Sequence, residues 1–164
     1  MENWGPLLAG IAAFVLMEGA AWAAHKYLMH GWLWFLHADH HTKEPGFFEK
    51  NDAFFLIFAV PSWLCIMLGM MNNVWVSVGF GFGIAAYGLA YFFVHELFIH
   101  QRFRWIRNID TPYFRAVRRL HKMHHKVLTK EESAHFGMLW VPRQLIREEA
   151  AALKKELQRA QQQA

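Results

Sequence analysis

The sequence predicts an all-α integral membrane protein, built as a transmembrane helical bundle. Hydrophobic residues make up 55% of the 164 residues, and only 18% are charged, whereas about a quarter of an average soluble domain is charged. Three apolar stretches are long enough to cross a bilayer, which requires roughly 20 helical residues. The 11 histidines, nearly as many as the 13 acidic residues, stand out against this background and are not evenly distributed.

The three predicted spans are Trp4 to Ala24, Phe54 to Met71 and Val74 to Val94. Glu18 is the only charged residue in the first span, and Asp52 precedes the second at a position suited to capping its first turn. Only Asn72 and Asn73 separate the second span from the third. These two spans should therefore form an antiparallel helical hairpin.

The positions of lysine and arginine predict the orientation of the spans. Basic residues are concentrated in Lys26 to Lys50 and in Arg102 to Lys126, and are absent before Trp4 and from the Asn72-Asn73 turn. By the positive-inside rule, both basic segments are cytoplasmic and the N-terminus is outside. The first stretch lacks a basic n-region, so we do not expect a cleavable signal peptide. Gly31 to Leu36 and Phe136 to Pro142 are apolar but too short to span, and are candidates for a fourth or re-entrant segment.

The last 22 residues differ in character from the rest of the chain. In residues 143–164, apolar side chains recur at helical spacing among charged and Gln residues, which predicts an amphipathic cytoplasmic helix. We therefore divide the chain into a membrane-embedded domain, 1–142, and this C-terminal helix, 143–164. Packing of the helix on the body or on the membrane, and a short dimer interface, are both open interpretations.

Ten histidines form four groups that repeat one pattern, HxxxxH followed by HxxHH. The groups are His25 and His30; His37, His40 and His41; His95 and His100; and His121, His124 and His125. All four lie in parts of the chain assigned to the cytoplasmic side. A single histidine in an apolar protein is more often a structural residue than a ligand, but four spaced groups at one membrane face indicate a metal site. Cys65 is the only cysteine, so the ligands must be imidazoles.

Helix geometry suggests how many metal ions these groups could bind. Each residue of an α-helix advances about 100°, so the first histidine of HxxHH lies within about 60° of each of the other two, and one motif can serve two centres. The two histidines of HxxxxH diverge by about 140° on a regular helix, which suits one ligand for each of two ions. Two ions with about four or five nitrogen ligands each are expected. Imidazole alone does not distinguish zinc, copper, iron and nickel.

Several other polar residues have two interpretations. His135 matches no motif and is expected to be structural or a hydrogen-bond partner of a ligand. Glu18 lies seven residues before His25, so it could orient that imidazole, or it could be a buried protonated acid. Glu96 and Asp39 lie inside histidine motifs and could either orient imidazoles or face water. We assign none of these carboxylates as a metal ligand.

The segments HKYLMHGW, HADHH, NDAFF, HELFIHQRF, HKMHHK and SAHFGMLWVP together resemble the bacterial carotenoid β-ring 3-hydroxylases, within the fatty-acid hydroxylase and sterol desaturase superfamily. The resemblance covers roughly Glu18 to Pro142. It implies a non-haem di-iron centre, ligated by the ten clustered histidines, that uses O₂ to hydroxylate the 3 and 3′ carbons of β-carotene, giving zeaxanthin by way of β-cryptoxanthin. We expect a bacterial inner-membrane location, with the histidines facing the cytoplasm.

The chain lacks any motif for collecting electrons from a nicotinamide, so an external donor is expected. The resemblance suggests a ferredoxin with its reductase. The basic stretch Arg102 to Lys126 could dock this acidic donor or bind anionic lipid headgroups. The carotenoid should enter from the bilayer between the helices, where Gly79 and Gly83 are expected to allow close helix packing. No nucleic-acid partner is expected.

Other functions fit the same histidines. A carotenoid 4-ketolase or a lipid desaturase would use the same type of site on a different C–H bond. A zinc-binding membrane protein, such as a carrier, is a non-enzymatic alternative, and zinc could also replace iron in the enzyme. A carrier should place ionisable groups along a path at mid-membrane depth, and only Glu18 is a candidate for such a path.

Overall fold

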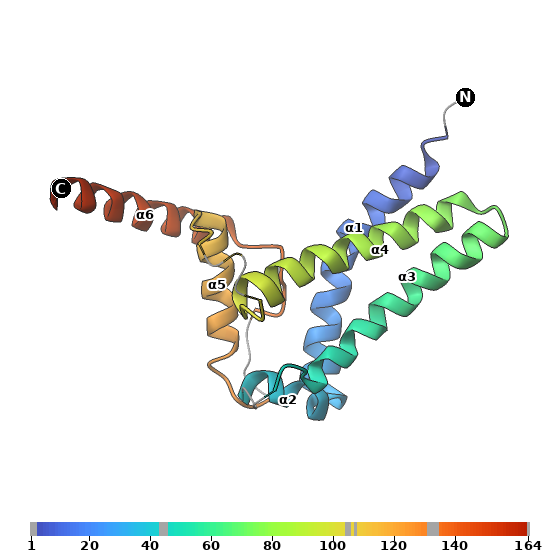
Figure 1. The fold of residues 1–164 in the computed structure, drawn as a ribbon, viewed down its shortest axis with the longest axis horizontal. Helices are drawn as coiled ribbons and strands as arrows, with labels where there is room; N and C mark the ends of the chain where they lie inside the picture. The colour runs from blue at the N-terminus through green and yellow to red at the C-terminus, as the bar shows by residue number, and fades with distance from the viewer. Residues whose placement is uncertain (1–2, 43–45, 104–105, 107, 131–134, 164) are drawn as a thin grey trace.

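The structure, a computed structural model, describes residues 3–42, 46–103, 106, 108–130 and 135–163. In these ranges the chain is helical with irregular connections and contains no strand, which confirms the all-α prediction (Figure 1). The elements are α1 (Gly5–Ala23), η1 (Ala24–Trp32), α2 (Trp34–Thr42), η2 (Lys50–Ala53), α3 (Phe54–Met71), α4 (Trp75–Phe92), η3 (Phe93–Ile99), α5 (Pro112–His124) and α6 (Arg143–Gln163). The elements η1 and η3 are π-helices, and η2 is a short 3₁₀-helix.

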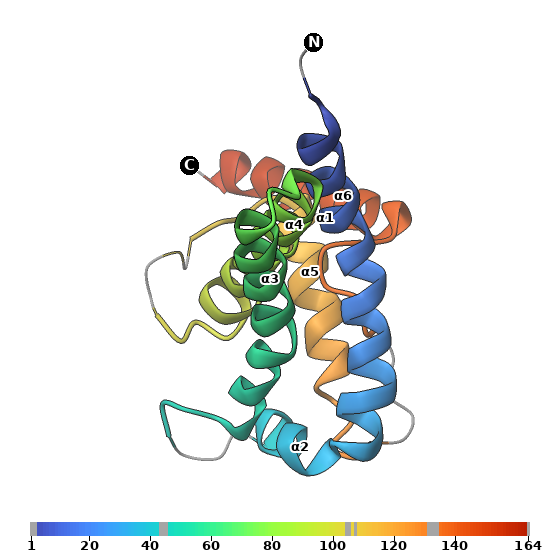
Figure 2. The same ribbon diagram turned by 90° about the vertical axis from the view of Figure 1, so that its right-hand side faces the viewer.

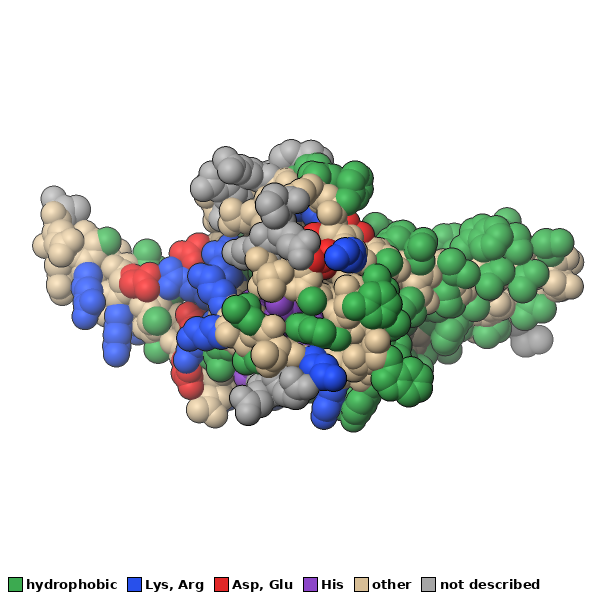
Figure 3. Space-filling view, turned by 90° about the horizontal axis from the view of Figure 1, so that it is seen from below, with side chains coloured by type: hydrophobic (Ala, Val, Ile, Leu, Met, Phe, Trp, Pro, Cys, Tyr) green, Lys and Arg blue, Asp and Glu red, His purple; other side chains and the backbone are tan. Residues whose placement is uncertain are grey.

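Three of these helical stretches are long and apolar enough to cross a membrane: Gly5–Trp32, Lys50–Met71 and Trp75–Ile99. They correspond to the three predicted spans, with the first and third each extended by a π-helix. The N-terminus and the α3–α4 turn lie at one end of the bundle, and α2 and α5 lie toward the other (Figure 1). Hydrophobic side chains cover the half formed by the spans, while charged side chains gather on the other half (Figure 3). The protein is therefore a membrane protein with one polar end.

Helix α4 packs closely against α1 because glycines remove the side chains between them. A Cβ atom added at Gly79 would lie 2.0 Å from the Pro6 carbonyl oxygen, and one at Gly83 would lie 2.2 Å from the Gly10 carbonyl oxygen. On the other side of α4, a Cβ atom at Gly81 would lie 2.7 Å from a backbone oxygen of α3. Small residues allow this kind of approach between membrane helices, as the sequence predicts for Gly79 and Gly83.

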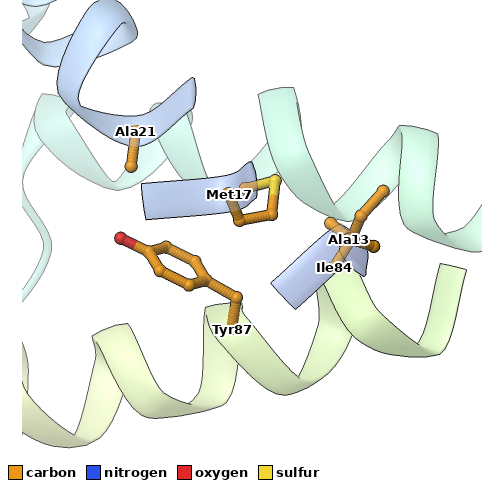
Figure 4. Packing of buried hydrophobic residues seen from close by; sticks show 5 residues of the cluster. All are labelled: Ala13, Met17, Ala21, Ile84 and Tyr87. Atoms are coloured by element: carbon orange, nitrogen blue, oxygen red, sulfur yellow. The ribbon is translucent and has the colours of Figure 1, made fainter. Parts of the chain in front are cut away.

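The core between the spans is small. Tyr87 of α4 extends toward Met17 and Ala21 of α1, and Ala13 and Ile84 complete this cluster (Figure 4). Many large apolar side chains of the spans point outward and are exposed in the isolated chain. In a bilayer, lipid would cover those side chains, so a small protein core is sufficient.

The polar end is built from α2, α5 and the segments that join them. The backbone of Gly31 leaves helical geometry (φ −118°, ψ −115°), outside the regions open to L-residues with a Cβ. This break turns the chain from η1 into α2, which lies across the end of the bundle between α1 and α3 (Figure 2). Thr111 caps α5, with its hydroxyl accepting from the Phe114 N–H, and Pro112 occupies the first turn, a favoured position for proline.

The C-terminal helix α6 packs on α5 over part of its length. Leu145 and Ile146 contact a buried cluster that includes Ala116 and Val117 of α5. Ion pairs extend the contact, with Arg115 bound to Glu156 and Arg119 bound to Glu148 and Glu149. Beyond these contacts, α6 projects away from the bundle (Figure 1). Packing on the body therefore holds for the amphipathic helix as far as Glu156.

Two expectations for local structure were wrong. Asp52 does not cap α3; its carboxylate accepts the Glu49 N–H in a capping box at the start of η2. Neither short apolar segment is a fourth span in the part of the chain described. Gly31 to Leu36 contains the break before α2, and Phe136 to Pro142 is an irregular connection that buries Met138 and Val141 in the cluster beneath α5 and α6.

Candidate metal centre

The ten clustered histidines converge at the polar end of the bundle, although they come from four separate segments. Eight of them form two groups, within each of which the candidate ligand nitrogens lie within 4.8 Å of one another. Metal–nitrogen bonds of about 2.1 Å place two nitrogens of one ion about 3 to 4 Å apart, so the spacing suits one ion for each group. The first group is His25, His30, His37 and His124, and the second is His40, His95, His100 and His121.

The π-helices explain why both histidines of each HxxxxH motif belong to the same group. A π-helix closes i to i+5 hydrogen bonds, so residues five apart lie about one turn apart. The His100 N–H donates to the His95 carbonyl oxygen at 2.9 Å, and the His25 and His30 ring centroids are 5.3 Å apart. The prediction that the two histidines would serve different ions, which assumed a regular α-helix, was wrong.

The HxxHH motifs do divide between the two groups, as the α-helix geometry predicts. On α2, His37 joins the first group and His40 the second. On α5, His121 joins the second group and His124 the first. Each of these helices therefore contributes to both groups and fixes the spacing between them.

The last two clustered histidines lie beside the groups. His41 has its Nε2 3.2 Å from the Nε2 of His37 in the first group. The His125 ring lies 4.4 Å from His121 and 4.7 Å from His40 in the second group, measured between centroids. The His41 and His125 rings stack on each other at 4.5 Å. These positions make His41 a candidate fifth ligand in the first group and His125 a candidate fifth ligand in the second, consistent with four or five nitrogens per ion.

In six of the ten histidines, the Nδ1 atom faces an oxygen that can only accept a hydrogen bond. Backbone carbonyl oxygens of Phe136, Lys130 and Val127 accept from His25, His30 and His41 respectively. Side-chain oxygens of Asn51, Glu49 and Glu96 accept from His37, His40 and His95, at 2.6 to 2.7 Å. This pattern places the proton on Nδ1 and leaves Nε2 with a free lone pair, as metal-bound histidines require.

The Nε2 lone pairs point at one another, an arrangement that a bound cation would stabilise. The Nε2 of His37 lies 3.2 Å from those of both His25 and His41, and none of the three carries a proton in this arrangement. The buried Nε2 atoms of His40 and His125 have no hydrogen-bond partner among the described residues. Buried polar atoms rarely remain unpaired. The donor set therefore fits metal ions and does not fit a set of structural histidines.

Burial also keeps the imidazoles at the polar end neutral. Desolvation is the main cause that lowers the pKa of His37 to about 2; the neighbouring imidazoles add to this shift, and the Asn51 side chain opposes it. The pKa values of His40 and His121 lie well below 6.5. Burial is the larger cause, and repulsion from the neighbouring imidazoles is the smaller one. The pKa of His125 falls to about 2 for the same reasons. Neutral imidazole is the metal-binding form.

A charged network supports the second group. Arg102 makes a bidentate contact with Asp52, at 2.9 and 3.0 Å, and its Nε forms an ion pair with the Glu96 carboxylate at 2.9 Å. Glu96 in turn orients His95, as one of its two sequence interpretations proposes, while Asp39 is buried and accepts the Lys50 N–H at 2.6 Å. Sequence reasoning missed the roles of Glu49 and Asn51, because no motif spacing links them to the histidines they hold. Asn51 is the first residue of the NDAFF segment, and Glu49 lies two residues before it. This position was the only available signal.

Glu18 and His135 both lie outside the two groups. Glu18 makes no contact with His25; its carboxylate accepts the Tyr87 hydroxyl and three backbone N–H groups, those of Met138, Leu139 and Trp140. If Glu18 orients His25, as one of its two sequence interpretations proposes, it must do so through these other residues. His135 is exposed and has a positive φ of 64°, as expected for a histidine that does not belong to the ligand set.

Intramolecular contacts occupy much of the arginine-rich stretch. Arg102 belongs to the network described above, Arg115 and Arg119 pair with α6, and Arg118 lies over the Phe98 ring at 4.3 Å. Arg104 and Arg107 lie outside the described residues. Lys122 and Lys126 are exposed on and directly after α5, next to the histidines. If this stretch docks a partner, Lys122 and Lys126 are the charges available to it among the described residues.

An apolar cavity of about 660 Å³ lies between α1, α3 and α4. Its walls are mostly apolar and aromatic, with Met17 from α1, Phe58 from α3 and Ile84 from α4. His25 of the first group also lines it, as do Asp52, Glu96 and Arg102 of the charged network. Its size is typical of small-molecule sites. The cavity therefore connects the apolar interior of the bundle to the candidate metal centre.

The fold and the site together define a helical membrane protein with a two-centre histidine site. The fatty acid hydroxylase family matches residues 10–142, and the chain belongs to this family. The chain is 41% identical to a β-carotene hydroxylase of Pantoea ananas over 141 residues, 85% of this chain and 78% of that protein. Identity to a β-carotene hydroxylase of Pseudescherichia vulneris is 39% over 132 residues, 79% of this chain and 73% of that protein.

Plant proteins are also similar to the chain. It is 36% identical over 147 residues to a chloroplastic β-carotene 3-hydroxylase of Gentiana lutea, which covers 88% of this chain and 45% of that protein. No solved structure matches the chain. The geometry of the histidine groups therefore comes from the present structure alone.

Proposed function

We propose that this chain is a β-carotene 3-hydroxylase, a membrane monooxygenase that adds hydroxyl groups at the 3 and 3′ carbons of the β-rings. Zeaxanthin is then the product, by way of β-cryptoxanthin. The observation that carries the proposal is the pair of histidine groups beside an apolar cavity, in a chain 41% identical to a β-carotene hydroxylase. Three spans suited to a bilayer agree with a substrate dissolved in lipid.

The two groups would hold two iron ions, with His41 and His125 completing the ligand sets. Bound there, the ions would supply the O₂ activation that an unactivated ring C–H bond requires. Zinc is a possible replacement, because imidazole binds both metals. The residues of this chain orient the ligands through Nδ1, keep them neutral by burial, and exclude water from the site.

The cavity between α1, α3 and α4 would hold one β-ring of the carotenoid. Its walls are apolar, and exposed apolar side chains on the spans around it, such as Phe55 and Leu89, would face lipid. A ring entering between these helices meets His25 at the edge of the first group. The rest of the polyene would remain in the bilayer, so that each end of a symmetric carotene could be presented in turn.

The histidine end faces the cytoplasm in this proposal, and the membrane is the bacterial inner membrane. The exposed lysines at that end support this orientation through the positive-inside rule. Electrons would come from a soluble ferredoxin-type donor with its reductase, docking at Lys122 and Lys126. These two lysines flank His124 and His125 in sequence, so docking there would keep the path of the electrons short.

Expression in a bacterial host that accumulates β-carotene tests the function. Extracted pigments should contain zeaxanthin and β-cryptoxanthin, and a variant with His37→Ala and His40→Ala should leave β-carotene unchanged because it removes one ligand from each group. Canthaxanthin would instead identify a 4-ketolase, and unchanged carotene with altered lipids would identify a desaturase or lipid hydroxylase. Tightly bound zinc with no oxidised product in any pool would favour the non-enzymatic zinc-binding protein.

A further inference from the structure

Glu18 is a carboxylate inside a membrane span, and it is held entirely by hydrogen-bond donors. Its Oε2 accepts the Tyr87 hydroxyl at 2.7 Å, and its two oxygens accept N–H groups of three consecutive residues, Met138, Leu139 and Trp140, at 2.9 to 3.1 Å. Consecutive backbone N–H groups converging on one anion form an effective anion-binding nest. A carboxylate is costly inside a membrane, so packing alone does not explain this arrangement.

Gly137 provides a second, independent sign that the segment is shaped around this carboxylate. A Cβ atom added at Gly137 would lie 3.1 Å from Glu18 Oε1, closer than an ordinary van der Waals contact. The absence of a side chain at residue 137 therefore lets Glu18 approach the backbone. The segment crosses from the α1 side to the α5 side, where Met138 and Val141 are buried and Tyr113 donates to the Leu139 carbonyl at 2.8 Å.

The same segment holds a ligand of the first histidine group at its other end. The carbonyl oxygen of Phe136, two residues before Met138, accepts from Nδ1 of His25 at 3.1 Å. The Phe136 ring also packs against His25, His30 and His124 at centroid distances of 5.1 to 5.5 Å. These are three of the four members of the first group. The second group has no equivalent contact with this segment among the described residues.

We propose that Glu18 is a positioning residue for the first metal site. Its carboxylate fixes the segment from Phe136 to Trp140, and that segment fixes the tautomer and ring orientation of His25. The sequence places Glu18 and His25 on nearly the same helix face, but the structure links them through residues more than a hundred positions away. The inference rests on the metal centre of the proposed function and is independent of which substrate is oxidised.

The test compares the two metal sites within one protein. Glu18→Gln keeps the size of the side chain but replaces one acceptor oxygen with a donor, which cannot accept from the backbone N–H groups. We expect the affinity of one of the two sites for iron to fall by about 10- to 100-fold, as is typical when a partner of a ligating histidine is lost, while the other site keeps its iron. Iron per purified chain, and the Mössbauer spectrum of the ⁵⁷Fe-loaded protein, would show one site changed and one unchanged.

Two further variants keep the inference testable if Glu18→Gln does not fold. Gly137→Ala should displace the carboxylate, and Tyr87→Phe should remove one of its four donors, so both should disturb the same site in the same direction and more mildly. Glu148→Gln, which removes a carboxylate from the α5–α6 contact, is the matched control and should change neither site. Equal changes at both sites, or no change in any folded variant, would overturn the proposal.

Pigment analysis of the unmodified chain separates this inference from the proposed function. Absence of zeaxanthin with the unmodified chain would refute the activity, while the comparison of iron binding between variants would still stand. Conversely, zeaxanthin formation together with an iron spectrum unaffected by Glu18→Gln would retain the activity and reject the role of Glu18.

Discussion

At the scale of single residues, an acceptor oxygen at Nδ1 fixes the orientation of six of the ten clustered histidines. Backbone carbonyls hold His25, His30 and His41, whereas carboxylates hold His40 and His95. A carboxylate partner makes an imidazole a stronger ligand than a carbonyl does. Both of these carboxylates hold histidines of the second group. The two metal sites therefore differ in their surroundings, although their ligands are of one type.

Acid should destabilise the protein and release its metal, beginning near neutral pH. An unfolded histidine titrates near 6.5, while burial lowers the pKa values of folded His37 and His125 to about 2. The unfolded chain therefore binds more protons throughout this window, so stability is full above about 6.5 and falls as the pH decreases toward 2. We expect iron content and the thermal unfolding temperature in detergent to decrease together between pH 7 and pH 4.5.

The exposed His135 provides the control for this pH dependence. His135→Ala should leave the acid profile and the iron content unchanged, because its side chain is exposed and lies outside both groups. Iron content that remains constant down to pH 4.5 would contradict the assignment of buried neutral histidines as the ligands.

At the scale of elements, the two π-helices decide the composition of the site. They extend the first and third spans beyond α1 and α4, and they bring both histidines of each HxxxxH motif onto one side. π-helical turns inside α-helices are rare and occur often at functional sites. In this chain their function is evident, because a regular α-helix would direct the two imidazoles about 140° apart.

The contact between α1 and α4 should tolerate no side chain at its glycines. Gly79→Ala places a methyl group 2.0 Å from the Pro6 carbonyl oxygen, so the helices must separate, at a cost of about 1 to 3 kcal/mol. We expect a lower thermal unfolding temperature in detergent and a loss of iron, because the separation shifts the spans that carry both π-helices. Gly19→Ala, where a Cβ atom meets nothing within 4 Å, should be neutral. A Gly79→Ala protein as stable as the Gly19→Ala protein would refute this packing.

At the scale of the whole molecule, the chain separates an apolar body from a polar end (Figure 3). The cavity lies in the body and reaches the histidines, whereas the exposed lysines lie on the polar side of the same histidines. A lipid-soluble substrate and a soluble electron donor could therefore reach one centre from opposite directions. These two directions of access follow from the position of the histidine groups at the polar end of the spans.

Charge reversal on α5 tests the route of the electrons. Lys122→Glu with Lys126→Glu should raise the KM for a reduced ferredoxin on the order of tenfold, with little change in iron content, because opposite charges attract an acidic donor mainly through the association step. High salt should reduce the difference between the variant and the unmodified chain. Lys154→Glu with Lys155→Glu, two exposed lysines of α6, is the matched control. Unchanged turnover at every donor concentration would exclude docking at these lysines.

The sequence alone determined the membrane bundle, its three spans and the histidines that meet, but left a fourth or re-entrant segment open. Apolar length specifies the spans because the bilayer has a fixed thickness, and four histidine groups at one face are difficult to explain without metal. The division of each HxxHH motif between two centres also follows from the α-helix period. These features depend on local composition and spacing, which are fully visible in one sequence.

Only the tertiary structure decided which histidines share a centre and what holds them. The π-helical turns have no signature in hydrophobic period, so the pairing of His25 with His30 could not be foreseen. Glu49, Asn51 and the link from Glu18 through the segment before α6 depend on contacts between distant parts of the chain. Helix period specifies the direction of a side chain, but long-range packing decides what it meets.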